Sequence, residues 1–123
     1  PIIVTGRNRA EVEEEKGLHR RRIAFYASTR TYHPVFELHG WQDLGMRLHA
    51  LSLEGRWDEM AKLIPEAMAT EFATIAPLAE LGDALREKWS GLLTTLNLPT
   101  SLPLGTDEER RQVRRLVETL QQA

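Results

Sequence analysis

The chain of 123 residues has the length of one domain and is too short for two separate hydrophobic cores. Its 41% hydrophobic and 28% charged residues are typical of a packed globular protein and exclude wholesale disorder. The formal charge is only -2, so no overall field attracts nucleic acid or an anionic membrane, and the lack of cysteine excludes disulfide scaffolds and thiol chemistry. No apolar stretch approaches the ~20 residues of a membrane span. We therefore expect one cytoplasmic domain over residues 1–123.

The first elements are predicted to be a strand and a long helix. Residues 1–6, with the sequence PIIVTG, are β-branched, apolar and ended by glycine, which is typical of a buried strand. Asn8 can cap a helix and Glu11 follows three residues later, so the pattern predicts a helix from Arg9 to about Thr29. The helical spacing predicts one apolar stripe, made of Val12, His19, Ile23 and Tyr26.

Prolines and single glycines delimit the helices that follow. A short helix is predicted from Pro34 to His39, because proline fits the first turn of a helix and Gly40 can end it. A second helix, buried through its leucines, is expected to stop at Gly55. The apolar periodicity then continues through a third helix, which Pro65 kinks or ends. The buried side of this third helix is predicted to comprise Trp57, Met60, Ala61, Ile64 and Met68.

The last third of the chain alternates apolar runs and helices. Residues 72–76 indicate a short strand, and a helix from Leu78 is predicted to stop at Gly91. Residues 92–98 are the second good strand candidate, ended by Pro99. Thr106 and the acid three residues later predict the start of the final helix. We expect the strands at 1–5 and 92–98 to be parallel neighbours, and their outer edges then need a cover.

One series of motifs resembles a known family. The series comprises RIAFYAST at residues 22–29, Tyr32, LHGW at 38–41 and GRWDEM at 55–60. It is similar to the luciferase-like monooxygenase superfamily, and more narrowly to the deazaflavin-dependent oxidoreductases in it that resemble methylene-tetrahydromethanopterin reductase. The opening strand and the closing elements also resemble that family, so the likeness covers nearly the whole chain.

The resemblance implies an α/β fold that is mainly helical, namely the C-terminal part of an eight-stranded β/α barrel, with two or three short parallel strands. The complete family protein would hold coenzyme F-420, a deazaflavin, or FMN, and would catalyse hydride transfer or monooxygenation of a small-molecule substrate. The chain begins without methionine, on a strand, which we interpret as the interior of a longer protein. We expect this chain alone to lack a complete active site.

Candidate site residues follow from the barrel geometry. Residues just beyond the strand ends face the reaction site, so Thr5, Gly6, Arg7 and Asn97 are the cofactor-binding candidates. The alternatives are that Arg7 is solvated and that the neighbouring Asn8 is only a helix cap. The substrate-binding candidates are Tyr26, Tyr32, His39 and Trp41. Their structural alternatives are half-buried tyrosines near a helix end, a histidine that fixes a turn, and a core tryptophan. No catalytic residue is identified.

Metal binding and a basic surface are disfavoured. Two pairs, His33 with Glu37 and His39 with Asp43, have helical i,i+4 spacing, but Gly40 interrupts the helix between them and no metal site is predicted. The basic run at residues 19–22 is interpreted as a solvated helix face, in which Glu15 pairs with His19.

Two function classes remain open. The first is the C-terminal portion of a flavin- or deazaflavin-dependent oxidoreductase. The second is a non-catalytic, truncated helical module that binds no cofactor and self-associates, most simply as a dimer, through its strand edges and apolar helix faces.

Overall fold

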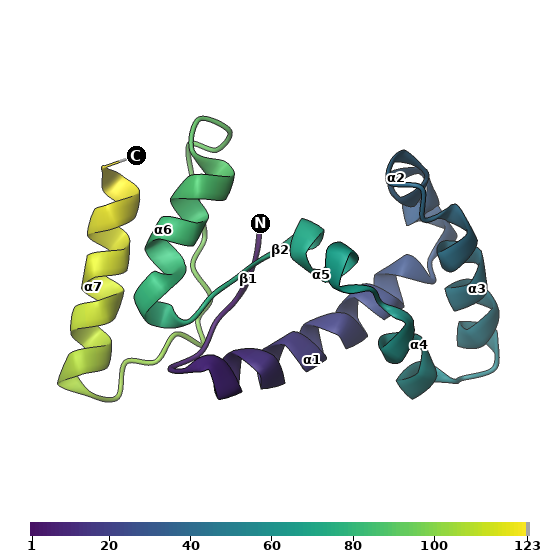
Figure 1. The fold of residues 1–123 in the computed structure, drawn as a ribbon, viewed down its shortest axis with the longest axis horizontal. Coiled ribbons are helices and arrows are strands. Elements are labelled where there is room, and N and C mark those ends of the chain that lie inside the picture. Colours follow the sequence, from purple (N-terminus) through teal and green to yellow (C-terminus); the bar gives the residue numbers. More distant parts are fainter. Residues whose placement is uncertain (123) are drawn as a thin grey trace. The chain divides into compact units, whose positions relative to one another are not determined.

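A computed structural model describes residues 1–122 (Figure 1). Its elements in chain order are β1 (Ile2–Val4), α1 (Arg9–Ala27), the 3-10 helix η1 (Arg30–Tyr32), α2 (His33–Leu38), α3 (Gln42–Leu53), α4 (Trp57–Leu63), α5 (Glu66–Phe72), β2 (Ala73–Ile75), α6 (Leu78–Trp89) and α7 (Asp107–Gln121). The described chain is therefore mainly helical, with one two-stranded sheet.

The chain divides into two compact units. One, here called the sheet unit, comprises residues 1–16 and 70–122, and the other, the helical unit, comprises Gly17–Ala69. The boundaries fall inside α1 and inside α5, so both of these helices contribute to both units. The expectation of a single domain over the whole chain stays a prediction.

The sheet unit contains β1 and β2, which pair in parallel. Ile2 lies opposite Ala73 and Val4 opposite Ile75. Two backbone bonds extend the pairing beyond the strands, from the Ala76 N–H to the Val4 carbonyl at 3.1 Å and from the Leu78 N–H to the Gly6 carbonyl at 2.9 Å. The weak strand predicted at residues 72–76 is therefore the partner of the opening strand.

The prediction of a strand at residues 92–98, lying parallel to the opening strand, is wrong, because β1 pairs with β2 and no strand forms there. Gly91 adopts φ 77°, and the N–H groups of Leu92 and Leu93 both bond back to the Trp89 carbonyl, which closes α6 in a turn. The segment then runs as an irregular loop, with Leu96 and Leu98 packed on the core of the unit. Periodicity alone does not separate a buried strand from an apolar loop that crosses two helices.

The core of the sheet unit lies between α6 and α7. Its buried members are Ala76, Leu78, Leu81, Leu85 and Leu116. The two helices approach closely at Gly82, where an added Cβ would lie 3.1 Å from Thr119 Cγ2. The start of α7 follows the sequence prediction: Thr106 Oγ1 accepts from the Glu109 N–H at 3.1 Å, and Glu109 returns a bond to the Thr106 N–H at 2.9 Å.

The helical unit packs the second half of α1 with α2 to α5. Leu48, Met60 and Met68 have no exposed surface. Gly40 and Gly55 have φ of 73° and 70°, as the predicted helix stops require. Of the two alternatives for Pro65, a kink or a helix end, the structure shows the end: α4 stops at Leu63 and a separate helix, α5, begins at Glu66 and carries Met68.

Some side chains predicted to be buried are exposed. Tyr26 is 51% exposed and Trp57 is 46% exposed, so the apolar stripe of α1 ends at Ile23 and Trp57 lies outside the core. Both residues lie at helix ends, where the helices supply no further neighbours to cover a large ring. A stripe inferred from spacing thus overestimated burial at the termini of the elements.

Candidate functional site

Three of the predicted cofactor-binding residues lie at one edge of the sheet. Because β1 and β2 are parallel, their carboxyl ends meet at the same edge, where Thr5 and Gly6 follow β1 and Ala76 and Pro77 follow β2. Thr5 Oγ1 is buried and has no hydrogen-bond partner among the described residues. It is therefore a free donor and acceptor at this edge.

Gly6 allows β1 to pass close to the start of α1. An added Cβ would lie 2.6 Å from Glu11 Cβ and 3.0 Å from the Val12 backbone nitrogen. The space that Gly6 leaves is therefore filled by α1, and the glycine serves the close approach of strand and helix.

Arg7 is held between two carboxylates. Its Nε donates to Glu109 Oε1 at 2.5 Å and its Nη1 to Glu11 Oε1 at 3.2 Å, while its backbone N–H donates to Glu11 Oε2 at 2.8 Å. The hydrogen bonds to Glu109 and then Glu11 raise the pKa of Arg7. The bond from the Arg7 side chain lowers the pKa of Glu109, and the bond from the Arg7 backbone lowers that of Glu11. An anion at Arg7 would have to compete with both acids.

Asn8 is the predicted helix cap. Its Oδ1 accepts from the Glu11 N–H at 2.9 Å. The Glu11 side chain does not accept a bond from the Asn8 N–H. Its Oε2 accepts instead from the N–H of the preceding residue, Arg7. The interpretation of Asn8 as a cap is confirmed.

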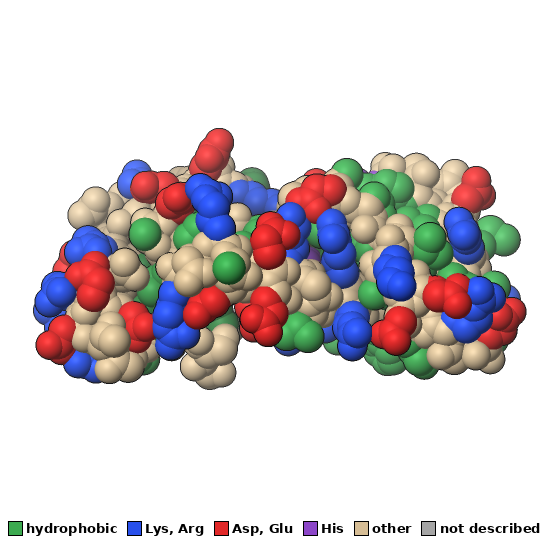
Figure 2. All heavy atoms as spheres, turned by 60° about the horizontal axis from the view of Figure 1, so that its bottom comes forward, with side chains coloured by type: hydrophobic (Ala, Val, Ile, Leu, Met, Phe, Trp, Pro, Cys, Tyr) green, Lys and Arg blue, Asp and Glu red, His purple; other side chains and the backbone are tan. Residues whose placement is uncertain are grey.

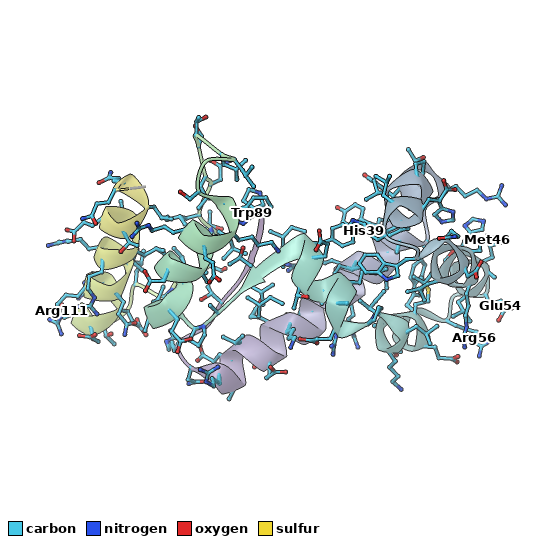
Figure 3. The ribbon with its side chains drawn as sticks, turned by 45° about the horizontal axis from the view of Figure 1, so that its top comes forward. His39, Met46, Glu54, Arg56, Trp89 and Arg111 are labelled. Carbon is cyan, nitrogen blue, oxygen red and sulfur yellow. The ribbon has the colours of Figure 1, made fainter. Side chains whose placement is uncertain are left out.

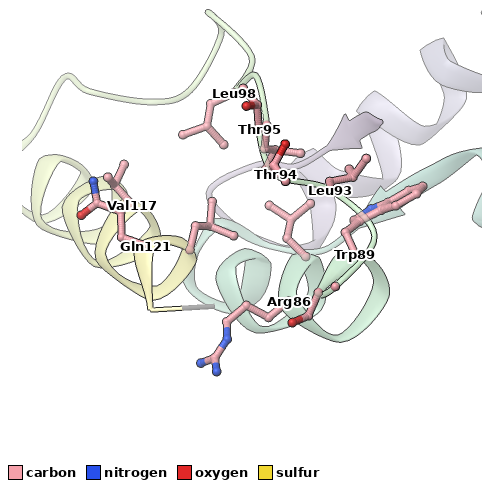
Figure 4. A pocket seen from close by; sticks show the side chains of 13 residues that line it. Arg86, Trp89, Leu93, Thr94, Thr95, Leu98, Val117 and Gln121 are labelled. Atoms are coloured by element: carbon pink, nitrogen blue, oxygen red, sulfur yellow. The ribbon is translucent and has the colours of Figure 1, made fainter.

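Asn97 lies apart from this cluster in the loop that follows α6. It is exposed, and no hydrogen bond of its side chain to another described residue is seen. Its neighbours Leu96 and Leu98 line an open groove of about 830 Å³ inside the sheet unit. Figure 4 shows this groove, with side chains from α6, from the loop after it and from α7 turned toward one space.

The predicted substrate residues belong to the helical unit. Ring contacts link Tyr26 with Tyr32 at 5.6 Å between centroids, and His39 with Trp41, stacked at 4.7 Å. Phe25 extends the first contact, because it lies 5.5 Å from Tyr26 and 6.1 Å from Trp57. We call Trp57, Phe25, Tyr26 and Tyr32 the aromatic row.

The aromatic row is open to solvent. Phe25 and Tyr26 are both more than half exposed, and Tyr32 is 44% exposed. These values agree with the interpretation of the two tyrosines as half-buried side chains near a helix end. The hydroxyl groups at that helix end bond back to the helix. Ser28 Oγ and Thr29 Oγ1 both donate to the Phe25 carbonyl, at 2.7 and 3.3 Å.

Two further histidines bond to carbonyl groups at the end of α1. His33 Nε2 donates to the Ala27 carbonyl at 3.2 Å, and His49 Nδ1 donates to the Ser28 carbonyl at 2.8 Å. Both therefore satisfy carbonyls that the helix leaves without an internal partner. Within residues 1–122, no group of three or more His, Asp or Glu side chains is placed to hold a metal ion.

His19 is buried and does not lie on a solvated face. Its side chain has no exposed surface, and Nε2 lies 3.3 Å from the Ala69 carbonyl, to which it donates. Nδ1 has no partner in the described chain, and burial lowers the pKa of the ring. The predicted pairing of His19 with Glu15 is therefore wrong, because His19 turns toward α5.

Charges are mixed over the surface. In Figure 2, Lys and Arg side chains alternate with Asp and Glu over the visible face. Arg56 is typical: it bonds Glu54 at 2.9 Å and Glu59 at 2.5 Å, next to Glu54 in Figure 3. These hydrogen bonds, with Glu59 first, raise the pKa of Arg56. None of the helices in the described part of the chain is both long and apolar enough to cross a membrane.

Three features of the structure were not predicted from the sequence. Glu109 was identified as a capping acid but not as the partner of Arg7, which lies 102 residues away. The groove and Lys88 were also missed. Lys88 Nζ donates to the carbonyls of Thr70, Glu71 and Ala73 at 2.6 to 3.0 Å. The acid at the start of α7 was a usable signal, whereas the other two depend on chain segments that only folding brings together.

Comparisons with known proteins identify relatives without a described activity. The chain is 39% identical over 92 residues to an uncharacterized protein of Mycobacterium bovis, and equally to uncharacterized proteins from two strains of Mycobacterium tuberculosis. The match covers 75% of this chain but 27% of each relative, so the chain spans about a quarter of their length. No family model and no solved structure matches.

Proposed function

We propose that this chain is the C-terminal part of a luciferase-like oxidoreductase that uses FMN or the deazaflavin coenzyme F-420. The observation that carries the proposal is the sheet edge, where two parallel strands, each followed by a helix, bring Thr5, Gly6 and Arg7 beside Ala76 and Pro77. Repeated β/α units with functional residues at the carboxyl ends of the strands are the building plan of a β/α barrel. The motif series at residues 22–60 supports the choice of family.

The uncovered sheet is consistent with a piece of a larger barrel. Among the described residues, β1 and β2 pair only with each other, so each has one unpaired edge. In a closed barrel both edges would pair with further strands. Relatives about four times longer than the matched segment supply enough chain for those strands.

The residues at the sheet edge fit only a small part of the cofactor. Thr5 Oγ1 offers one free hydrogen-bonding group, whereas Arg7 is already neutralised by Glu11 and Glu109. When bound, the flavin or deazaflavin would supply the hydride chemistry. In this proposal the chain adds one wall of the substrate pocket through Tyr26, Tyr32, His39 and Trp41, and the remaining protein holds most of the cofactor.

The mycobacterial relative provides the decisive test. We expect its crystal structure to place the segment matched by this chain within an eight-stranded barrel, and we expect FMN or coenzyme F-420 to change absorbance when titrated with the protein. In this chain, Thr5→Val should weaken any residual cofactor binding, whereas Thr100→Val, an exposed loop substitution, should not. A matched segment that folds as a separate helical domain, in a relative that binds neither cofactor, would contradict the proposal.

A second candidate function is supported by the exposed apolar side chains of the helical unit. In addition to the side chains of the aromatic row, two leucines of this unit are exposed, Leu38 by 85% and Leu53 by 77%. Such surface is typical of protein contact sites, so the alternative is a non-catalytic module that self-associates, most simply as a homodimer. Light scattering against concentration tests it: Phe25→Ser should shift a dimer to monomer, and Leu104→Ser, an equally exposed control in the sheet unit, should not. A monomer at all concentrations rules out this candidate.

A further inference from the structure

The groove between α6, the loop at residues 91–98 and α7 has the features of a small-molecule site. Its volume of about 830 Å³ lies within the roughly 300–1,000 Å³ that is usual for ligand pockets. We propose that this groove binds an aliphatic carboxylate, with the alkyl chain along the leucines and the carboxylate at Arg86. The proposal goes beyond the oxidoreductase function and does not depend on it.

The walls of the groove are mainly apolar. Leu85 and Trp89 come from α6, Leu93, Leu96 and Leu98 from the loop, and Leu120 from α7. Leucine side chains from three segments offer an alkyl chain contact on several sides. Since burying an alkyl chain is favourable in proportion to the area removed from water, these walls supply the main driving force.

The positive charge of the lining is the reason for proposing an anionic head group. Arg86 is the only charged residue among those that line the groove, and no Asp or Glu lines it, although the chain has 18 acids. Its guanidinium has no ion-pair partner in the described part of the chain and extends away from the leucines at the rim (Figure 4). The proposal requires this exposed side chain to turn toward the mouth when a carboxylate is bound, because arginine can bind both carboxylate oxygens.

Two helix ends lie at the groove and have to be weighed against the charge of Arg86. Both α6 and α7 end at the groove, and a helix C-terminus carries partial negative charge. However, the Arg86 carbonyl accepts from the Ser90 N–H at 2.9 Å, and the Trp89 carbonyl accepts from Leu92 and Leu93. Two of the last four carbonyls of α6 are therefore already hydrogen-bonded, and in this proposal the full positive charge of Arg86 outweighs the partial negative charge that remains at the two helix ends.

Trp89 provides a reporter inside the groove. Its indole N–H donates to Thr74 Oγ1 at 2.9 Å, and the other two tryptophans, Trp41 and Trp57, belong to the helical unit. In an amide and indole NMR titration with decanoate, we expect the indole peak of Trp89 to shift while those of Trp41 and Trp57 stay. Binding should strengthen about fourfold for each methylene added between octanoate and decanoate.

Head-group and variant comparisons test the role of Arg86. Decanoate should bind more tightly than decanol, and decanol more tightly than decyltrimethylammonium. Arg86→Gln should weaken decanoate about two- to fivefold at low salt, in the range of a surface charge pair, and leave decanol unchanged. Arg114→Gln is the matched control, because Arg114 is an exposed α7 arginine that does not line the groove.

Three results would overturn the proposal. The first is that decanoate leaves the Trp89 peak unmoved up to its solubility limit. The second is that Arg86→Gln weakens decanoate and decanol equally, because the charge would then have no role. The third is a Trp89 peak that moves with protein concentration alone, together with a dimer by light scattering, because a second copy would then occupy the groove. Circular dichroism of each variant confirms that the helices are retained.

Discussion

The sheet unit and the helical unit stabilise their helices in different ways. In the sheet unit, α1 and α7 begin with side-chain caps, Asn8 and Thr106, that bond the free N–H groups of the first turn, whereas α6 begins after Pro77 without a side-chain cap. In the helical unit, the residues that precede η1, α2, α3 and α4 make no such bond. Glycines follow the helix ends in both units, Gly40 and Gly55 here and Gly91 after α6, but the helical unit also has histidine bonds to the carbonyls at the end of α1.

Capped helix starts and long-range histidine bonds differ in how much of the chain they require. A cap acts within three residues, so it specifies a helix start without help from the rest of the chain. A histidine that bonds a carbonyl 21 residues away, as His49 does at Ser28, acts only after the fold has formed. We therefore expect core truncations to destabilise both units, and substitutions of helix caps to have a measurable effect only in the sheet unit.

The largest expected effect comes from truncating one core leucine in each unit. Leu81 in the sheet unit and Leu48 in the helical unit have no exposed surface. Each change to alanine should lower the free energy of unfolding by about 2–5 kcal/mol. Denaturant unfolding followed at Trp89 reports the sheet unit, and Trp41 reports the helical unit. Equal shifts of both reporters for both variants would contradict separate responses of the two units, because the units would then unfold as one.

Two glycine substitutions in the sheet unit and at the unit boundary should have opposite signs. Gly6→Ala places a Cβ 2.6 Å from Glu11 Cβ and should destabilise the chain by about 1–3 kcal/mol. Gly17→Ala meets no atom within 4 Å inside α1 and should stabilise it by about 0.5–1 kcal/mol. Thermal unfolding measures both. A neutral Gly6→Ala would show that α1 does not need its close approach to β1.

Loss of the α7 cap should have a smaller effect. Thr106→Ala removes the bond to the Glu109 N–H and should cost about 1 kcal/mol of stability. Thr100→Ala changes an exposed loop threonine and should stay within about 0.5 kcal/mol. Chemical unfolding of the two variants side by side tests whether local caps matter in the sheet unit. Equal stabilities would mean that packing on α6 alone holds α7 in place.

The smallest effect near neutral pH comes from His19 in the helical unit. Burial lowers the pKa of its ring below the usual 6.5, so the unfolded chain binds more protons than the folded one below that pH. Stability contributed by neutral His19 is full above pH 6.5 and falls as the pH drops toward the lowered pKa. Once protonated, the His19 ring would be repelled by the positive charges of Arg22 and Arg20 on α1, and both arginines lower its pKa further.

A pH series of unfolding midpoints separates His19 from the acids. The loss between pH 7 and 5 should disappear in His19→Gln, although that variant is less stable overall. The acids Glu11 and Glu109, whose pKa values are lowered below 4.5 by Arg7, lose their contribution only at more acidic pH. An unchanged slope in His19→Gln between pH 7 and 5 would assign that slope to other groups.

The candidate site was predictable only in part. Thr5, Gly6 and Arg7 follow a strand in the sequence, and their position at the strand end is confirmed because β1 forms where its β-branched residues indicated. Asn97 was chosen as the end of a second strand that does not form, so it lies in a loop. Its selection failed because a short segment with four leucines among seven residues does not by itself distinguish a strand from a loop packed on helices.

Local sequence was enough to predict the opening strand, the start of α1 at Asn8, the helix stops at Gly40, Gly55 and Gly91, and the start of α7 at Thr106. Each of these depends on backbone preferences and hydrogen bonds within a few residues. The pairing of β2 with β1, the ion pair of Glu109 with Arg7 and the bond of His19 to the Ala69 carbonyl depend on the tertiary structure, although the apolar stripe of α1 already included His19. These contacts join residues 50 to 102 positions apart, and their energy exists only once the intervening chain is packed.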